Sequence, residues 1–373
     1  MKVIIDDKIP YIKGALEPFG EVIYLPGSKT TPEIAKDADA IITRTRTNCN
    51  EKLLAGSTVK FIASATIGYD HIDTDYCERS GITWTNAPGC NSKSVEQYIA
   101  SALMALAEKN GFKLTEKTIG VVGVGNVGSK VARLCETFGM KVLLNDPPRA
   151  REEGGNGFVG LDELLDKADI ITLHVPLNME GEDKTYHMAD GAFFARTKKN
   201  PIIINSCRGE VTATLALKNA RIGGQISGIV IDCWENEPVI DLELLDLVDL
   251  GTPHIAGYSK DGKANGTSMS IRALSKFFNL GIDNWKCKDI ELPDSTEIII
   301  DGTSKTTQQV LAEAIFATYD IREDDKRLRA SVSTFEKQRG DYPVRREFPT
   351  FNVICKVNNI KTINKLKLLG FRL

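Results

Sequence analysis

Short, continuously apolar runs recur along the chain, separated by stretches with helical spacing. In the first part of the sequence these runs occupy residues 2–6, 21–25, 40–43, 59–65 and 83–86. Continuous apolar runs of this length are typical of parallel strands that are buried on both faces. Of the stretches between them, one begins with Thr31 followed by Pro32, a favoured helix start. The pattern predicts an α/β domain built on a parallel sheet.

A long helix and a second series of apolar runs follow. The helix has apolar residues at spacings of three and four, which predicts one buried face: Val95, Tyr98, Ile99, Ala102, Leu103 and Leu106. The second series lies at 118–124, 141–146, 169–175, 201–206 and 228–233. A helical pattern from about 259 to 279 is expected to pack back on the first domain, so the second domain is an insertion.

The pattern changes beyond about residue 286. An apolar strand at 297–301, a helix from Gln308 to about Tyr319, a charged stretch and an alternating strand at 351–357 indicate a small α+β appendage. The half-buried strand and the helix need a partner surface, so we expect this appendage to form a homodimer. The predicted fold is α/β, with two doubly wound parallel-sheet domains of Rossmann-like or flavodoxin-like type. Their expected bounds are 1–97 with 256–285, 98–255, and 286–373 for the dimerisation appendage.

Composition narrows the class of protein. The chain has 373 residues, 42% hydrophobic and 26% charged, with a net charge of -3, which gives no reason to expect a nucleic-acid partner. No apolar run approaches the roughly 20 residues of a membrane span, and no signal-peptide core opens the chain, so we expect a cytoplasmic protein that does not enter a membrane. The eight cysteines contain no C-x-x-C pair, so neither a metal site nor a disulfide framework is predicted.

A glycine-rich turn carries the first chemical signal. Gly123, Gly125 and Gly128 form G-x-G-x-x-G between an apolar strand and a helix expected to begin near Asn126. The first glycine permits the tight turn, the second lets the backbone approach a pyrophosphate, and the third lets helix and strand pack closely. Such a turn also occurs without a ligand. Here Asp146 follows roughly 20 residues later at a strand end, which completes the pattern of a dinucleotide site.

The same aspartate bears on the choice of cofactor. Asp146 is expected to accept hydrogen bonds from the adenosine ribose hydroxyls and to repel a 2′-phosphate, which favours NAD over NADP. Arg149 and Arg151 keep NADP open as an alternative. A purely structural loop cap is the other interpretation of Asp146.

Three further strand ends carry polar groups suited to hydride-transfer chemistry. Removing a hydroxyl proton near neutral pH requires a base, and His254 is one of only four histidines. Glu237 could orient its imidazole, and the planar fork of Arg208 matches the carboxylate of a 2-hydroxy acid. Singly, each residue has a structural alternative: a surface ion pair for Arg208, a loop charge for Glu237 and a satisfied core histidine for His254.

Seven motifs together resemble the D-isomer-specific 2-hydroxyacid dehydrogenase family over roughly residues 1–285. They are ATIGYDHID (65–73), GVGNVG (123–128), Asp146, HVP (174–176), NSCRGE (205–210), DCWENEP (232–238) and TPHIAGYS (252–259). The resemblance implies that Arg208, Glu237 and His254 form the catalytic set. It also implies that His254 accepts the proton in oxidation and that Asp232 lies beside the nicotinamide amide.

The same resemblance extends the cofactor and substrate sites. It adds to the NAD site Asn126, Val127, Val175, Ser206, Cys207 and Gly257. Val175 stands where a threonine is common, so a side-chain hydrogen bond is lost there while apolar packing is retained. A narrower likeness at 86–98, 254–259 and 335–348 implies a phosphorylated 2-hydroxy acid substrate that contacts Thr45, Thr66 and Tyr258.

Two questions stay open in the sequence. The first is which cationic or N–H donors hold the phosphate; the candidates are Arg44 and Arg46, ranked first, then Ser92, Lys93, Lys260, Arg345 and Arg346. The second is the function itself, because a dehydrogenase for a shorter phosphorylated hydroxy acid and a dinucleotide-sensing co-repressor are both alternatives. The complete Arg208, Glu237 and His254 set favours an enzyme over a sensor.

Overall fold

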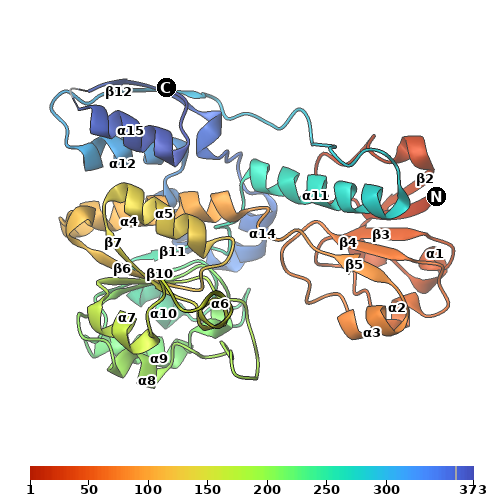
Figure 1. The fold of residues 1–373 in the computed structure, drawn as a ribbon, viewed down its shortest axis with the longest axis horizontal. Helices are drawn as coiled ribbons and strands as arrows, with labels where there is room; N and C mark the ends of the chain where they lie inside the picture. Colours follow the sequence, from red (N-terminus) through yellow and green to blue (C-terminus); the bar gives the residue numbers. More distant parts are fainter. Residues whose placement is uncertain (358) are drawn as a thin grey trace. The chain divides into compact units, whose positions relative to one another are not determined.

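The computed structural model describes residues 1–357 and 359–373, which divide into two compact units (Figure 1). The first unit comprises residues 1–91 and 259–292, and the second comprises residues 92–258 and 293–373. The second unit therefore contains both the segment predicted to bind the dinucleotide and most of the C-terminal appendage. The separate dimerisation domain stays a prediction.

The first unit contains a five-stranded parallel sheet in the order β2-β1-β3-β4-β5. Its strands are β1 (Lys2–Asp6), β2 (Glu21–Leu25), β3 (Ala40–Thr43), β4 (Phe61–Ser64) and β5 (Thr83–Thr85). Its helices are α1 (Pro32–Ala35), α2 (Glu51–Leu54), α3 (Thr74–Arg79) and α11 (Lys260–Phe278). Two apolar clusters cover the two faces of this sheet, and Ile271 and Leu274 of α11 belong to one of them. The late helix thus completes the first domain, as the sequence pattern predicts.

The second unit contains a six-stranded parallel sheet in the order β11-β10-β9-β8-β6-β7. The strands are β6 (Thr118–Val122), β7 (Lys141–Asn145), β8 (Ile170–Leu173), β9 (Ile202–Asn205), β10 (Gly228–Ile231) and β11 (Leu250–Gly251). The helices of this part are α4 (Ser92–Asn110), α5 (Gly128–Phe138), α6 (Pro147–Glu153), α7 (Leu161–Lys167), α8 (Gly191–Ala195), α9 (Thr214–Ile222) and α10 (Leu242–Leu247). The strand order reverses between β6 and β8, and ligands of such sheets bind beyond the carboxyl ends of the strands at that point.

The C-terminal segment packs on helix α4. It contains β12 (Glu297–Asp301), α12 (Thr307–Thr318), α13 (Ile321–Ala330), α14 (Phe335–Gly340), β13 (Asn352–Lys356) and α15 (Ile360–Leu369). β12 and β13 form a two-stranded parallel sheet. Helix α4 is buried beyond the single face that its apolar spacing predicts, because α12 and α13 cover it as well as α5. Ser101 on that additional face donates a hydrogen bond to the carbonyl of Tyr319 at 2.9 Å.

Helix α13 lies where the sequence indicates only a charged stretch. Its apolar positions are few, but Ile321 and Leu328 are both completely buried. Leu328 joins the apolar cluster beneath the six-stranded sheet together with Phe335 of α14. Among the described residues, no helix is long and apolar enough to cross a membrane.

Candidate active site

The glycine-rich turn after β6 combines two crowded positions with one open position. Gly123 has φ +85°, and a Cβ there would lie 2.6 Å from the carbonyl oxygen of His174. A Cβ on Gly128 would lie 1.9 Å from the carbonyl oxygen of Gly123, whereas a Cβ on Gly125 would meet no atom within 4 Å. Helix α5 begins at Gly128, two residues later than predicted. The turn therefore leaves open space at Gly125, where a pyrophosphate can approach the backbone.

Asp146 lies at the carboxyl end of β7, beside this turn. One carboxylate oxygen accepts a hydrogen bond from the Val124 N–H at 2.7 Å, and the other accepts one from the Arg149 N–H at 3.1 Å and caps α6. The structural cap is thus present, while the half-buried carboxylate retains lone pairs for a ligand. Arg149 pairs with Glu153, and Arg151 pairs with Asp183. Arg149 and Arg151, which left NADP as an alternative cofactor, therefore already have carboxylate partners.

The loops after β8 and β9 add three features to the site. Burial lowers the pKa of His174 to about 3, so its imidazole is neutral and unsuited to general-base chemistry near neutral pH. The next residue, Val175, approaches the glycine turn, because its Cγ1 would lie 2.9 Å from a Cβ on Gly123. The buried Ser206 hydroxyl has no hydrogen-bond partner among the described residues. Such an orphaned polar atom, together with the open position at Gly125, fits a bound dinucleotide.

Arg208 follows β9 and is held by its own loop. Its carbonyl oxygen accepts a hydrogen bond from the Asn205 side chain at 2.9 Å, and its Nη1 donates to the Cys207 carbonyl at 2.8 Å. At Gly209, an added Cβ would lie 2.1 Å from the backbone carbonyl of Trp234. The two loops therefore pack backbone to backbone, which places Arg208 beside the loop that carries Glu237. Sequence reasoning did not single out Gly209, although its position directly after Arg208 was the available signal.

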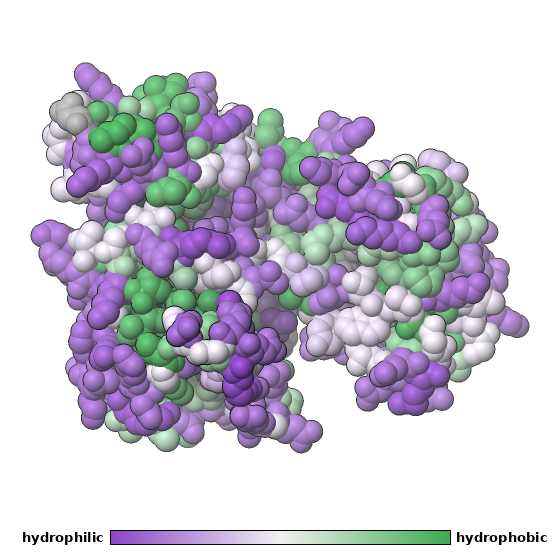
Figure 2. All heavy atoms as spheres, viewed as in Figure 1, coloured by the Kyte–Doolittle hydropathy of each residue, from purple (hydrophilic) through white to green (hydrophobic). Residues whose placement is uncertain are grey.

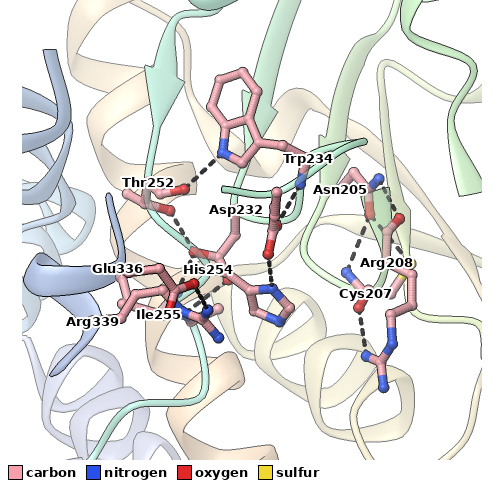
Figure 3. A network of polar contacts seen from close by, with 12 residues as sticks. Asn205, Cys207, Arg208, Asp232, Trp234, Thr252, His254, Ile255, Glu336 and Arg339 are labelled. Atoms are coloured by element: carbon pink, nitrogen blue, oxygen red, sulfur yellow. Dashed lines mark hydrogen bonds and ion pairs between the residues drawn. The ribbon is translucent and has the colours of Figure 1, made fainter. Parts of the chain in front are cut away.

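His254 and Glu237 form a hydrogen-bonded pair. His254 Nδ1 lies 2.7 Å from Glu237 Oε2, and Glu237 Oε1 accepts a hydrogen bond from the Trp234 N–H at 2.8 Å. Both side chains are only partly exposed, and His254 adopts a left-handed backbone conformation with φ +55°. Because Nδ1 faces the carboxylate, Nε2 is left to exchange a proton with a ligand. Figure 3 shows His254 and Arg208 in the same region, after the carboxyl ends of β11 and β9, two strands of the same sheet.

Asp232 fixes the segment that carries His254. Its buried carboxylate accepts hydrogen bonds from Thr252 Oγ1 at 2.6 Å, from the Ile255 N–H at 2.7 Å and from the Ala256 N–H at 2.9 Å (Figure 3). Burial raises the pKa of Asp232, although these hydrogen bonds and His254 oppose that effect. Tyr98 of α4 extends the network through a 2.9 Å hydrogen bond to Thr252. The segment that carries the His254 imidazole is thus held by several hydrogen bonds, which suits a preorganised site.

The predicted substrate contacts are distributed between the two units. Thr45 is exposed after β3, and Thr66 follows β4, where its hydroxyl lies 2.8 Å from that of Ser64; both belong to the first unit. Tyr258 belongs to the second unit and packs edge-on against Tyr342, with ring centroids 5.9 Å apart. Gly257 directly precedes Tyr258. The roles of all these residues stay predictions.

The residues predicted to bind the substrate phosphate differ in the hydrogen bonds and ion pairs that they already make within the protein. In the first unit, Arg44 donates to the Lys8 carbonyl at 3.2 Å, and Lys260 pairs with Glu291. Burial, Arg44 and Lys260 lower the pKa of Lys263 to about 8, so this lysine, which sequence reasoning missed, adds a third nearby cation.

In the second unit, Arg345 is 3% exposed and donates to Gln97 Oε1 at 2.9 Å and to the backbone carbonyls of Ser94 and Ile255. Its guanidinium also lies 3.8 Å from the centroid of the Tyr319 ring. These contacts support a packing role for Arg345.

Known families and proteins match the chain along nearly its whole length. Residues 92–256 match the family described as D-isomer specific 2-hydroxyacid dehydrogenase, NAD binding domain, and residues 292–370 match a domain of unknown function. Erythronate-4-phosphate dehydrogenase from Bacteroides fragilis is 54% identical over 95% of this chain and 99% of its own. The enzymes of the same name from Porphyromonas gingivalis and Escherichia coli O157:H7 are 44% and 41% identical, over 95% and 100% of this chain and 95% and 98% of their own.

Solved structures of dehydrogenases are also similar to the chain. D-lactate dehydrogenase from Aquifex aeolicus, complexed with NAD and lactic acid, is 29% identical with a TM-score of 0.61, covering 76% of this chain and 97% of that one. NAD-bound 3-phosphoglycerate dehydrogenase from Entamoeba histolytica, 24% identical with a TM-score of 0.63 over 78% of this chain and 99% of that one, supports the fold. The predicted pair of doubly wound domains and the NAD-binding domain are confirmed. The chain therefore belongs to the D-isomer-specific 2-hydroxyacid dehydrogenase family, within the group of erythronate-4-phosphate dehydrogenases.

Proposed function

We propose that the chain oxidises 4-phospho-D-erythronate to 2-oxo-3-hydroxy-4-phosphobutanoate with NAD. The observation that carries this proposal is identity of 41–54% to erythronate-4-phosphate dehydrogenases across both units, with the C-terminal segment included. The hydrogen-bonded His254 and Glu237 pair supplies the acid-base group that such a reaction requires. The reaction would serve pyridoxal 5′-phosphate biosynthesis. A cytoplasmic location is part of the proposal, since all eight cysteines are free.

The proton and the carboxylate of the substrate are handled by three side chains. His254 Nε2 accepts the proton of the C2 hydroxyl while the hydride leaves C2, so that the carbon becomes a carbonyl. Glu237, hydrogen-bonded to Nδ1 at 2.7 Å, keeps Nε2 directed to the substrate and stabilises the imidazolium that forms. Arg208 binds the carboxylate with its planar fork and polarises the C2 oxygen.

NAD supplies the hydride acceptor when it is bound. The open backbone at Gly125 would hold the pyrophosphate, and Asp146 would bind the adenosine ribose. Ser206, whose buried hydroxyl lacks a partner among the described residues, would hydrogen-bond to the cofactor, and Val175 would pack against it. Asp232 would lie beside the nicotinamide amide.

The test is an NADH-absorbance assay that compares 4-phospho-D-erythronate with 3-phosphoglycerate. We expect kcat/KM to be higher for 4-phospho-D-erythronate, and a difference of one small group between substrates is worth about 1–3 kcal/mol, or roughly 10- to 200-fold. A preference for 3-phosphoglycerate would identify the alternative dehydrogenase. The absence of turnover with any 2-hydroxy acid would favour the co-repressor.

We also propose a homodimer formed through the C-terminal segment. Ile299 of β12 and Ile354 of β13 are register partners, and they are 75% and 49% exposed. Figure 2 shows hydrophobic side chains at the surface over β12 and α15. The other face of this sheet is buried through Ile298, Ile300 and Val353, and a second copy of the chain would cover the exposed apolar face.

A further inference from the structure

Helix α14 is fixed against the core of the second unit. Phe335 is 1% exposed and belongs to the same apolar cluster as Trp234, in the loop that leads to Glu237. Gln338 donates hydrogen bonds to the carbonyls of Arg327 at 3.2 Å and Ser331 at 2.9 Å. The side chains of this helix therefore have a defined position relative to the catalytic loop.

Arg339 of this helix lies beside residues of the active site. Its guanidinium carbon is 5.8 Å from the centroid of the Tyr258 ring and 6.0 Å from that of Phe335. Burial lowers the pKa of Arg339, but Tyr258, Glu336 and Glu237 outweigh this effect and the pKa is raised. Figure 3 shows Arg339 and Glu336 entering the region of His254 from the C-terminal segment. Arg339 is thus a permanent cation close to the His254 and Glu237 pair.

The hydrogen-bonding capacity of Arg339 is largely unused. Its Nη1 donates to Glu336 Oε1 at 2.7 Å, and its buried Nε has no hydrogen-bond partner among the described residues. Arg345, six positions later in the chain, instead distributes its donors over Gln97, Ser94 and Ile255. Glu336 pairs with one end of the guanidinium, but burying the Nε donor without an acceptor is costly, and a ligand oxygen beside Arg339 would remove that cost.

We propose that Arg339 binds the phosphate of the substrate. This inference rests on the proposed function, in which Arg208 holds the carboxylate and the other end of the substrate carries the phosphate. A guanidinium matches phosphate oxygens with two parallel hydrogen bonds, and Tyr258, a predicted substrate contact, lies alongside it. The C-terminal segment then selects the substrate in addition to its proposed role in association.

The experiment compares kcat/KM for 4-phospho-D-erythronate and for D-erythronate in three variants. Arg339→Gln removes the cation, Arg339→Lys keeps the charge without the planar fork, and Lys337→Gln removes a cation from the exposed side of the same helix as a control. We expect Arg339→Gln to reduce the preference for the phosphorylated substrate by roughly 10- to 100-fold, mainly through KM. Arg339→Lys should retain part of the preference, and Lys337→Gln should retain all of it.

The outcomes separate this inference from the proposed function. If the wild type does not oxidise 4-phospho-D-erythronate, the proposed function fails and the phosphate assignment fails with it. If the wild type oxidises it but Arg339→Gln loses activity equally with both substrates, or loses none, only the Arg339 assignment is overturned. Thermal unfolding of Arg339→Lys identifies a purely structural role, because a structural loss would lower the melting temperature without changing the substrate preference.

Discussion

Substitutions in the glycine turn can separate its contribution to the stability of the fold from its contribution to NAD binding. An alanine at Gly125 adds a methyl group that meets no atom within 4 Å, so the free energy of unfolding should stay unchanged or rise by about 0.4–1 kcal/mol through the unfolded state. An alanine at Gly128 places its Cβ 1.9 Å from the Gly123 carbonyl oxygen, and the turn must move by about 1 Å. We expect that movement to cost about 1–3 kcal/mol.

The Gly125→Ala substitution should weaken NAD binding although it does not destabilise the fold. The added methyl group occupies the space through which the pyrophosphate approaches the backbone, so the Kd for NAD should rise by at least about tenfold, or 1.4 kcal/mol. Urea unfolding measures the stability of both variants, and calorimetric titration measures NAD binding. Wild-type NAD affinity in Gly125→Ala, or wild-type stability in Gly128→Ala, would refute the reasoning.

Three further predictions concern the cofactor, pH and association. Asp146→Ala should raise the Kd for NAD more than the Kd for NADP, and equal increases would remove its role in cofactor choice. Burial raises the pKa of Glu96 to about 7 from 4.5, so the native state binds the extra proton in this window and the free energy of unfolding falls as pH rises from about 4.5 to about 7. Glu96→Gln should flatten that fall in urea unfolding at pH 5 and pH 8, and an unchanged slope would contradict it. Ile299→Lys combined with Ile354→Lys should give monomers in sedimentation, whereas a persistent dimer would exclude this surface.

The sheets and the glycine turn could be predicted because their signals are local. The apolar runs are continuous since both faces of each parallel sheet are covered, and the strands of both sheets lie within those runs except the two-residue edge strand β11, which was not predicted. Helix α13 was missed because its charged sequence contains few apolar residues, and only the tertiary structure shows that Ile321 and Leu328 are buried.

The parts of the site that the sequence did not predict depend on contacts between residues that are far apart in the chain. The close approach of Gly209 to Trp234 follows from how two loops pack, and neither residue alone indicates it. Arg339 lies about a hundred positions from Glu237 in the chain, so only the fold brings its charge close to that carboxylate. Asp146 was assigned to the ribose from its position, but its hydrogen bond to the Val124 N–H became visible only in the structure.

The central claim is that His254, held by Glu237, removes the proton of the substrate hydroxyl. The most direct test is the turnover of 4-phospho-D-erythronate by His254→Ala, measured by NADH absorbance beside the Kd of the same variant for NAD. General-base catalysis typically contributes 10²–10⁴-fold, so we expect kcat to fall by about that factor while the Kd for NAD stays at the wild-type value. A His254→Ala enzyme that keeps kcat within about threefold of the wild type would contradict this claim.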